Sequence, residues 1–304
     1  MNKPQVSIVI LTINGLSENL SETLDGIYNQ GSNIPYEIIA IDNGSKDGTV
    51  EFLRKNPKIR LKTIPYSAFG HGKTRRLGAE LAKGELVVFL THDAAPANKK
   101  WLSSLLKNFR DPKVVGVCSR VVPRSDASLL KKIEVNNDLA GREERIEAKI
   151  ENKEEFDKLS FYEKRLNYYF FHDISSCVRR DYYLKKPAIT TSFAEDVEFA
   201  RMALSDGKKI VFEPNSIVYH SHDYQVVKTY KRNLTDSKYH REHWKVKNVP
   251  TIKNLLQNTI YLIRRDISEL KKYKVSPINK LVAILYSPVI HFAEQLGQYR
   301  GTRN

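Results

Sequence analysis

The sequence predicts an α/β fold whose central sheet is mostly parallel. Three short runs rich in valine and isoleucine, separated by segments with helical spacing, indicate buried strands; they cover residues 6–11, 36–41 and 85–90. Each run ends at a polar residue: Thr12, Asp42, or Asp93 through Thr91-His92. Open α/β sheets bind ligands beyond the carboxyl ends of their strands. We therefore expect Thr12, Asp42 and Asp93 to line one ligand site.

The segments between these runs have apolar residues at helical intervals. A helix is predicted over 17–30 with Ser17 as its N-cap, and a turn over 44–49 leads into a helix that reaches Lys55. Gly84 ends a further helix over 70–83. The later elements continue the alternation: helices over 97–109 and 193–205, and strands over 114–122, 173–179, 209–212 and 217–220.

These patterns divide the chain into two regions. Residues 1–225 form the predicted catalytic domain, which contains a charged, helical insertion over about 126–168 without strand signals. Residues 226–304 form a basic helical region, with helices predicted over 251–272 and 279–298.

Composition limits the class of protein. With 28% charged and 41% hydrophobic residues, the 304-residue chain is typical of a soluble globular protein. Residues 226–304 contain 16 Lys/Arg and 5 Asp/Glu, so they carry +11 of the net +15. This excess favours an acidic partner: nucleic acid, an anionic membrane surface or a phosphorylated substrate.

Cellular location is expected to be the cytosol. The two cysteines, Cys118 and Cys177, lie in apolar contexts without metal-ligand spacing and are predicted to be buried free thiols. The start of the chain lacks the pattern of a signal peptide, and no run approaches the roughly 18 apolar residues that span a bilayer. We therefore expect a protein that is not integral to a membrane.

Two glycine-containing segments suit a nucleotide. Asp42, followed by Asn43-Gly44-Ser45, can accept hydrogen bonds from a base or from ribose hydroxyls, although such clusters also form ordinary turns. The segment 69–76, Phe-Gly-His-Gly-Lys-Thr-Arg-Arg, opens a helix with glycines and cations, which suits a pyrophosphate. The alternative interpretation of residues 69–76 is a basic turn exposed to solvent.

Two further groups suit catalysis. Asp93 at a strand end can hold a divalent cation, and His220 or His222 can complete such a site, although a structural histidine is the alternative. Glu195 and Asp196 begin a predicted helix, where acids either stabilise the helix dipole or supply a general base for an acceptor hydroxyl.

Taken in order, these features resemble the family-2 glycosyltransferases of the GT-A fold over most of residues 5–225. The resemblance rests on the opening strand, the Asp-x-Gly-Ser loop, the Gly-x-x-x-Arg helix, the metal motif at 91–93 and the Glu-Asp pair. Thr91 replaces the first acid of the metal motif, which favours His220 as a further metal ligand. The segments 89–96, 176–180, 193–198 and 218–224 are more narrowly similar to bacterial rhamnosyltransferases.

The resemblance implies an α/β GT-A fold and an inverting reaction at the anomeric carbon without a covalent intermediate. Asp196 would be the base, with Glu195 beside it. Magnesium or manganese would be the cofactor, bound by Asp93 with His220 or His222. The residues implied in binding the donor nucleotide are Thr12, Asn14, Asp42, Gly72, Arg75 and His92, with Arg75 on the diphosphate.

The implied donor is a nucleotide sugar, dTDP-rhamnose, and the acceptor a cell-surface glycan or a polyprenyl-diphosphate-linked glycan. The +11 region would then face an anionic membrane surface at the inner face of the cell membrane, or its apolar residues would pack on the catalytic domain or a twin subunit in a homodimer. A metal-dependent nucleotidyltransferase and a basic nucleic-acid-binding module are the alternatives. The nucleotidyltransferase would need a second strong carboxylate at the metal. The nucleic-acid-binding module would need a recognition motif that the sequence lacks.

Overall fold

The computed structural model describes residues 4–31, 33–187, 189, 194–223 and 225–303. Phe193 and Tyr224, which belong to two of the segments that carry the resemblance, lie outside this set. Contacts divide the chain into two compact units: Met1–Val122 with Asp138–His220, and Pro123–Asn137 with Ser221–Asn304. The helical insertion predicted over 126–168 is thereby shared between the units.

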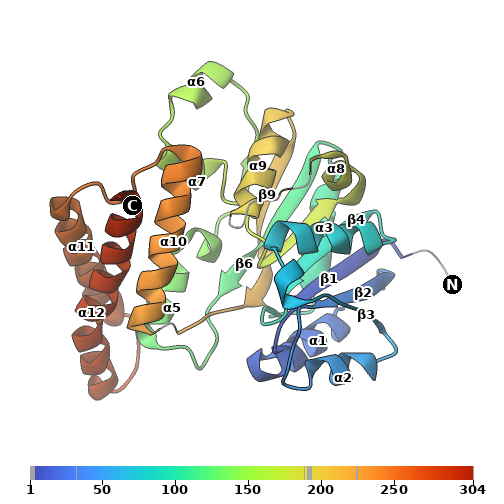
Figure 1. The fold of residues 1–304 in the computed structure, drawn as a ribbon, viewed down its shortest axis with the longest axis horizontal. Coiled ribbons are helices and arrows are strands. Elements are labelled where there is room, and N and C mark those ends of the chain that lie inside the picture. Colours follow the sequence, from blue (N-terminus) through green and yellow to red (C-terminus); the bar gives the residue numbers. More distant parts are fainter. Residues whose placement is uncertain (1–3, 32, 188, 190–193, 224, 304) are drawn as a thin grey trace. The chain divides into compact units, whose positions relative to one another are not determined.

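The first unit is built on a mixed sheet (Figure 1). Within the described residues it has nine strands: β1 Val6–Thr12, β2 Tyr36–Asp42, β3 Ile59–Thr63, β4 Leu86–Thr91, β5 Ala95–Pro96, β6 Val114–Val122, β7 Ile146–Ala148, β8 Ser175–Arg179 and β9 Lys209–Tyr219. Their order is β3-β2-β1-β4-β8-β6-β9-β5, and β7 pairs with β9. The pairs among β3, β2, β1 and β4 are all parallel, whereas β8 runs antiparallel to β4 and β6.

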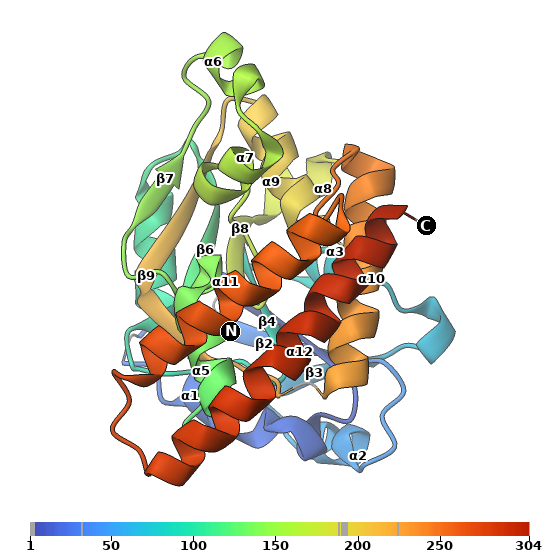
Figure 2. The ribbon, with the colours of Figure 1, turned by 90° about the vertical axis from the view of Figure 1, so that its left-hand side faces the viewer.

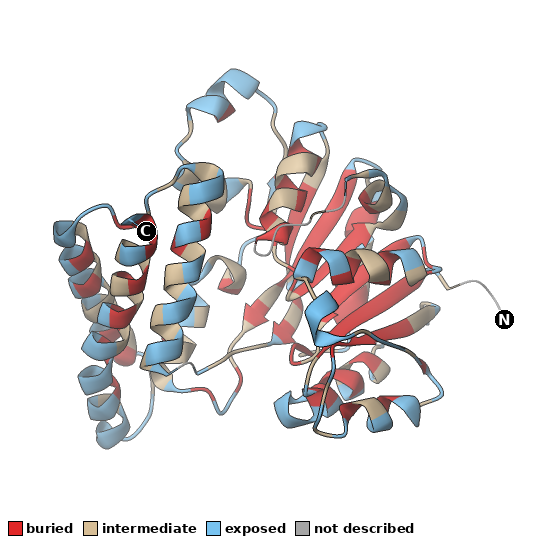
Figure 3. Cartoon of the chain, in the orientation of Figure 1, coloured by how far each residue is buried: buried red, intermediate tan, exposed pale blue. Residues whose placement is uncertain are grey.

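Helices cover both faces of the parallel strands, as the alternation in the sequence predicts. The helices of the first unit are α1 Leu20–Tyr28, α2 Thr49–Arg54, α3 His71–Leu81, α4 Trp101–Leu106, α6 Lys153–Lys158, α7 Phe161–Asn167, α8 Arg180–Lys185 and α9 Glu195–Ser205. Figure 1 shows α3 on one side of β1 and β2, and α1 and α2 on the other. Right-handed crossovers require this arrangement, because the chain moves outward from β1 to β3 and then returns to β4. The strands β1, β2, β4, β6 and β8 are buried along most of their length, whereas β3 at the edge of the sheet is largely exposed (Figure 3).

Three expectations about local structure were wrong. Ser17 does not cap α1, since the residue before the helix is Asn19 and the Ser17 N–H donates to Asp47 at 2.9 Å. The insertion contains a strand, β7, which is only three residues long and therefore gives no clear alternation. The two short strands expected over 209–220 are one strand, because the Pro214 segment is absorbed by a register shift against β6. Cys118 and Cys177 are buried free thiols, as predicted.

The second unit is helical. It contains α5 Leu129–Asn137, α10 Val226–Trp244, α11 Ile252–Leu270 and α12 Pro277–Arg303, and α12 packs against α5, α10 and α11 (Figure 2). Glycines allow the close approach of α10 and α12: a side chain at Gly297 or Gly301 would collide with the backbone carbonyl of Tyr230 or Leu234. No helix in the described part of the chain has both the length and the apolar character to cross a bilayer.

A buried polar cluster joins α11 to α12. The Asp266 carboxylate accepts hydrogen bonds from Ser287 Oγ and His291 Nε2, both at 2.7 Å. Burial lowers the pKa of His291, but the bonds to Asp266 and Glu294 outweigh it and raise that pKa to about 9. His291 is therefore charged at neutral pH, and its bond to Asp266 links α12 to α11.

Candidate active site

Three polar strand ends meet at one edge of the sheet. In the parallel ladders Thr12 lies opposite Asp42, and Leu11 lies opposite Thr91. The crevice beyond these ends is the place where open α/β sheets bind ligands. The residue runs predicted from the sequence therefore converge in space.

Asp42 organises the loop that follows β2. Its buried Oδ1 accepts hydrogen bonds from the N–H groups of Gly44 at 2.9 Å and Ser45 at 3.0 Å, and its Oδ2 accepts one from the Ser45 hydroxyl. Gly44 has φ of 83°, a conformation that glycine adopts without strain. The turn alone accounts for these residues locally, and a contact of Asp42 with a nucleoside stays a prediction.

Polar atoms beside Asp42 favour a ligand at this edge. Thr12 Oγ1 and Asn43 Oδ1 are buried, and neither has a hydrogen-bond partner among the residues that the structure describes. Buried polar atoms are nearly always paired, so these two suit the polar groups of a bound molecule. Asn14 ties the two loops together: its N–H donates to Ser45 Oγ at 2.7 Å and its Oδ1 accepts from the Lys46 N–H at 2.8 Å.

Asp93 lies in a group of potential metal ligands. The pairing of β5 with β9 places Ala95 opposite Tyr219, and His220 Nε2 is 3.5 Å from Asp93 Oδ2. Ligand atoms of Glu18, His92 and Asp93 also lie within 4.8 Å of one another. Carboxylate oxygen and imidazole nitrogen are ligands that suit a divalent cation such as Mn²⁺.

Two other histidines, His92 and His222, were also predicted at the site. His92 is held against β1, with Nδ1 3.3 Å from the Leu11 carbonyl oxygen and Nε2 3.3 Å from Glu18 Oε2. His222 belongs to the second unit, and its role as a ligand stays a prediction. Glu18 was missed from the sequence because it lies in a short 3₁₀ helix, Gly15–Glu18, that carries no metal motif.

Arg75 lies in a buried carboxylate cluster. Its Nε is 3.3 Å from Asp173 Oδ2, and its Nη1 pairs with the Glu195 carboxylate. The sequence predicts Arg75 on a diphosphate, and that contact stays a prediction. In this structure the guanidinium is engaged by two acids, so it holds Glu195 in place. Asp173 was missed, because neither its position nor its pairing is visible in a strand pattern.

The backbone connects this cluster to the end of β4. The Thr91 N–H donates to the Ile174 carbonyl at 3.1 Å, and the neighbouring Asp173 carbonyl accepts from Arg75 Nη2 at 3.4 Å. Thr91, which stands where the resemblance calls for an acid, therefore anchors the segment that carries Asp173.

Gly72 is required by packing. A side chain there would collide with the Ile189 carbonyl oxygen and would meet Cβ of Glu195 at 3.4 Å. The neighbouring His71 is exposed, yet desolvation by the surrounding residues and then the charge of Arg75 lower its pKa to about 4. His71 is therefore neutral at physiological pH and adds no positive charge to this helix start.

Asp196 has the properties of a base poised near neutrality. It begins α9, whose first turn carries Glu195, Asp196 and Glu198, and its Oδ1 accepts from the Val197 N–H at 2.7 Å. Burial, and then the nearby charges of Glu195 and Asp173, raise its pKa to about 7. Burial also raises the pKa of Glu195, which Arg75 opposes. Efficient general bases have a pKa near the working pH.

The sheet and the helices around it define an α/β protein of the GT-A fold. Residues 7–177 match the model of glycosyl transferase family 2, and the chain belongs to that family. It is 27% identical to the O-antigen chain rhamnosyltransferase RfbN of Salmonella typhimurium (strain LT2), over 78% of this chain and 72% of that protein. It is 29% identical to the O-antigen chain rhamnosyltransferase WbaN of Salmonella anatum, over the same shares.

A solved structure shares the fold. The mannosyltransferase PcManGT from Pyrobaculum calidifontis, in complex with GDP-Man and Mn²⁺, aligns with 99% of this chain and 86% of its own, with a TM-score of 0.57 and 18% identity. The expected family and fold class are thereby confirmed. This likeness concerns the fold alone.

The raised pKa of Asp196 predicts a dependence of stability on pH. The folded state holds the proton of Asp196 up to about pH 7, whereas the unfolded chain releases it near its usual pKa of about 4. This carboxyl group therefore costs stability progressively as pH rises between these values. Asp196→Asn removes the cost, and we expect it to raise the stability at about pH 8 by on the order of 1 kcal/mol, with little gain at about pH 4. Thermal unfolding across this range measures the difference.

Asp206→Asn provides a control of opposite sign. Hydrogen bonds from Lys186 and Tyr182 lower the pKa of Asp206, so its carboxylate stabilises the fold above its unfolded pKa, and this contribution is lost as pH falls. We expect Asp206→Asn to be less stable than the wild type at about pH 8. A pH-independent gain for Asp196→Asn would contradict the environment described for Asp196.

Proposed function

We propose that this family-2 glycosyltransferase transfers rhamnose, with inversion at the anomeric carbon, from a nucleoside-diphosphate sugar to a hydroxyl of a glycan or lipid-linked acceptor. The observation that carries the proposal is Asp196, a half-buried carboxyl group with a pKa of about 7 at the start of α9. The names of two relatives as O-antigen chain rhamnosyltransferases support rhamnose as the sugar. We infer dTDP-rhamnose as the donor from the resemblance to bacterial rhamnosyltransferases.

The donor would occupy the edge of the sheet. Thr12 Oγ1 and Asn43 Oδ1, which are buried without hydrogen-bond partners among the described residues, would bond the nucleoside, and Asp42 and Asn14 hold the loops beside them. His92 and Gly72 complete the predicted donor-binding residues. Arg75 would then act on the donor indirectly, through the position of Glu195 and the segment at Asp173.

A divalent cation, magnesium or manganese, would bind at Asp93. The structurally similar PcManGT is described in complex with Mn²⁺. In this chain His220 lies beside Asp93, and Glu18 and His92 lie close by. When bound, such a cation would stabilise the negative charge that develops on the leaving diphosphate.

In the reaction Asp196 would accept the proton of the acceptor hydroxyl as that oxygen bonds to the anomeric carbon and the bond from that carbon to the diphosphate breaks. We assign the proton to Asp196 because the Glu195 carboxylate is paired with Arg75, whereas Asp196 has a pKa of about 7. No covalent intermediate with the protein is required.

The second unit would place the enzyme on the inner face of the cell membrane. Much of α11 and α12 is exposed (Figure 3). The exposed residues of these helices include the apolar Leu256, Ile260, Tyr261, Ile278, Leu281, Val282 and Leu285. Arg264, Lys271 and Lys274 are exposed on the same helices or the turn between them. Apolar and cationic side chains together are typical of binding to anionic lipid. A homodimer through the same side chains is the alternative.

We expect Asp196→Asn to lower kcat by about 10²–10⁴-fold, because the amide cannot accept the proton. Donor binding should stay within about twofold of the wild type. The wild-type rate should rise with pH and level off above about pH 7, because the base must be ionised. Steady-state kinetics with dTDP-rhamnose measures both, and release of nucleoside diphosphate identifies glycosyl transfer.

Glu198→Gln on the same helix is the control and should be nearly as active as the wild type. Near-normal turnover of folded Asp196→Asn would transfer the role of base to Glu195. Release of pyrophosphate in place of nucleoside diphosphate would make the protein a nucleotidyltransferase.

Asp93→Ala should abolish the effect of Mn²⁺ on donor binding, because it removes the carboxylate at the centre of the ligand group. Calorimetric titration of dTDP-rhamnose with and without Mn²⁺ measures this effect. Asp157→Ala, which removes an exposed acid paired with Lys153, should retain it. Full wild-type activity in excess chelator would show that side chains of the protein replace the metal.

The membrane assignment predicts salt-sensitive binding to vesicles that contain anionic lipid. Replacing Lys271 and Lys274 together by Gln should weaken binding roughly 30-fold at low salt, since each cation near such a surface contributes about 1 kcal/mol. Co-sedimentation at increasing ionic strength measures the effect, and binding should fall steeply as salt rises. Replacing the exposed Lys55 and Lys62 of the first unit should change little. Wild-type protein that ignores such vesicles at low salt would exclude this location.

A further inference from the structure

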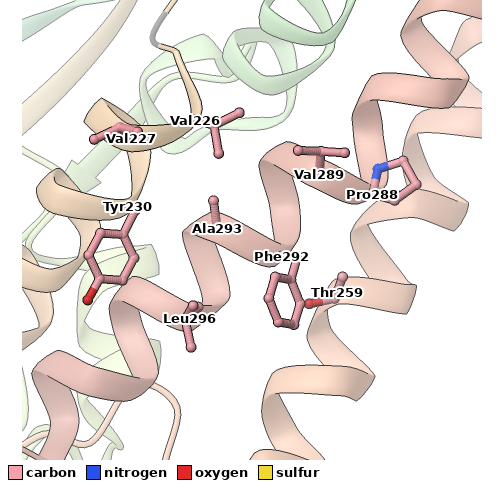
Figure 4. Close-up of a pocket in the computed structure, with 9 residues that line it drawn as sticks. All are labelled: Val226, Val227, Tyr230, Thr259, Pro288, Val289, Phe292, Ala293 and Leu296. Atoms are coloured by element: carbon pink, nitrogen blue, oxygen red, sulfur yellow. The ribbon is translucent and has the colours of Figure 1, made fainter.

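The second unit contains an apolar groove that the proposed reaction leaves unexplained (Figure 4). Its volume is about 670 Å³, within the range of sites for small molecules. The floor is α12, which packs against both α10 and α11. The lining side chains are Val226, Val227 and Tyr230 of α10, Thr259 of α11, and Pro288, Val289, Phe292, Ala293 and Leu296 of α12.

The chemistry of the lining selects a hydrocarbon. Only Thr259 and Tyr230 have polar side-chain atoms, and both are engaged within the unit. The Thr259 hydroxyl donates to the Leu255 carbonyl at 2.8 Å, and the Tyr230 hydroxyl accepts from Arg300 Nη1 at 3.1 Å. A sugar or a nucleotide would lose its hydrogen bonds to water here without replacement, which is costly.

One end of the groove is cationic. A second hollow, of about 480 Å³, shares Val227 with the groove and is lined also by Asp223, Gln225, Lys228 and Lys231. The acid in this set is engaged, since the Asp223 carboxylate accepts from the Ser128 N–H at 2.9 Å and from its hydroxyl at 2.5 Å. Lys228 and Lys231 are exposed and three residues apart on α10, so their ammonium groups lie on one face of the helix.

We propose that this groove binds the hydrocarbon chain of a single-chain lipid phosphate, with its phosphate group at Lys228 and Lys231. The adjoining apolar and cationic hollows match the two parts of such a molecule. The inference deepens the proposed function and rests on it in one respect: the lipid is the anchor of a lipid-linked acceptor. The hydrocarbon chain of that lipid would then contact α10, α11 and α12 as well as the bilayer.

Calorimetric titration with farnesyl phosphate tests the groove without a bilayer. Wild-type protein should bind farnesyl phosphate more tightly than farnesol and should not bind inorganic phosphate measurably. Val289→Asp, which puts a charge into the groove, should weaken binding at least tenfold. Leu281→Asp is the matched control, because both side chains are 49% exposed on α12 and Leu281 does not line the groove.

Further variants separate the parts of the site. Val227→Asp on α10 repeats the test from another helix, with circular dichroism to confirm that each variant is folded. Lys228→Gln and Lys231→Gln should each weaken farnesyl phosphate roughly fivefold and leave farnesol unchanged, whereas Lys238→Gln, farther along α10, should change neither.

Several results would overturn the proposal. The first is that wild-type protein does not bind farnesyl phosphate, and the second is that Val289→Asp binds it as tightly as the wild type. The third is that the protein is a dimer which Val289→Asp converts to a monomer, while no lipid phosphate binds. Equal affinity for dihexanoyl phosphatidic acid would assign the groove to a membrane phospholipid instead. Lost farnesyl phosphate binding with intact transfer to a soluble glycan would count against the groove alone. Intact farnesyl phosphate binding without any transfer would count against the proposed function alone.

Discussion

The ion pairs of Arg75 are the interaction on which the arrangement of the site depends. The guanidinium comes from α3, and its partners Asp173 and Glu195 are 98 and 120 residues away along the chain. Three carboxyl groups, including that of Asp196, are therefore crowded around one buried cation. Removing one partner of a buried ion pair typically costs about 3–5 kcal/mol, because the remaining charge stays buried. Arg75 thus holds Asp173 and Glu195 in place.

The same cluster gives two adjacent acids different properties. Glu195 is bonded to Arg75, whereas Asp196 is bonded to a backbone N–H and faces the charges of Glu195 and Asp173. Like charges that share a site raise one pKa strongly. The result is a carboxyl group positioned by Arg75 beside one whose pKa lies near neutrality.

The parallel half of the fold was predictable from the sequence, because its strands are continuous apolar runs and the polar residue after each run marks its end. The convergence of Thr12, Asp42 and Thr91 follows directly from parallel pairing. The antiparallel insertion of β8 between β4 and β6 was not predictable, since pairing partners leave no trace in an apolar pattern.

Side-chain pairing was equally hidden from the sequence. A basic helix start indicates positive charge, but whether Arg75 faces solvent, a ligand or an acid depends on segments about 100 residues away. Asp173 and Glu18 carry no motif of their own, and only the folded chain brings them to Arg75 and Asp93. Proline and polar residues within a strand also mislead, as residues 213–216 (Glu-Pro-Asn-Ser) of β9 illustrate.

The residue before the acidic pair, Ala194, has φ of 57°. Left-handed backbone costs a residue with a Cβ roughly 1–2 kcal/mol, a cost that glycine avoids. The backbone that leads into α9 is therefore strained at Ala194, and the packing of α9 must compensate for this cost. A change of φ at Ala194 to a negative value would rotate the first turn of α9. Glu195 and Asp196 would then move together, because both belong to that turn.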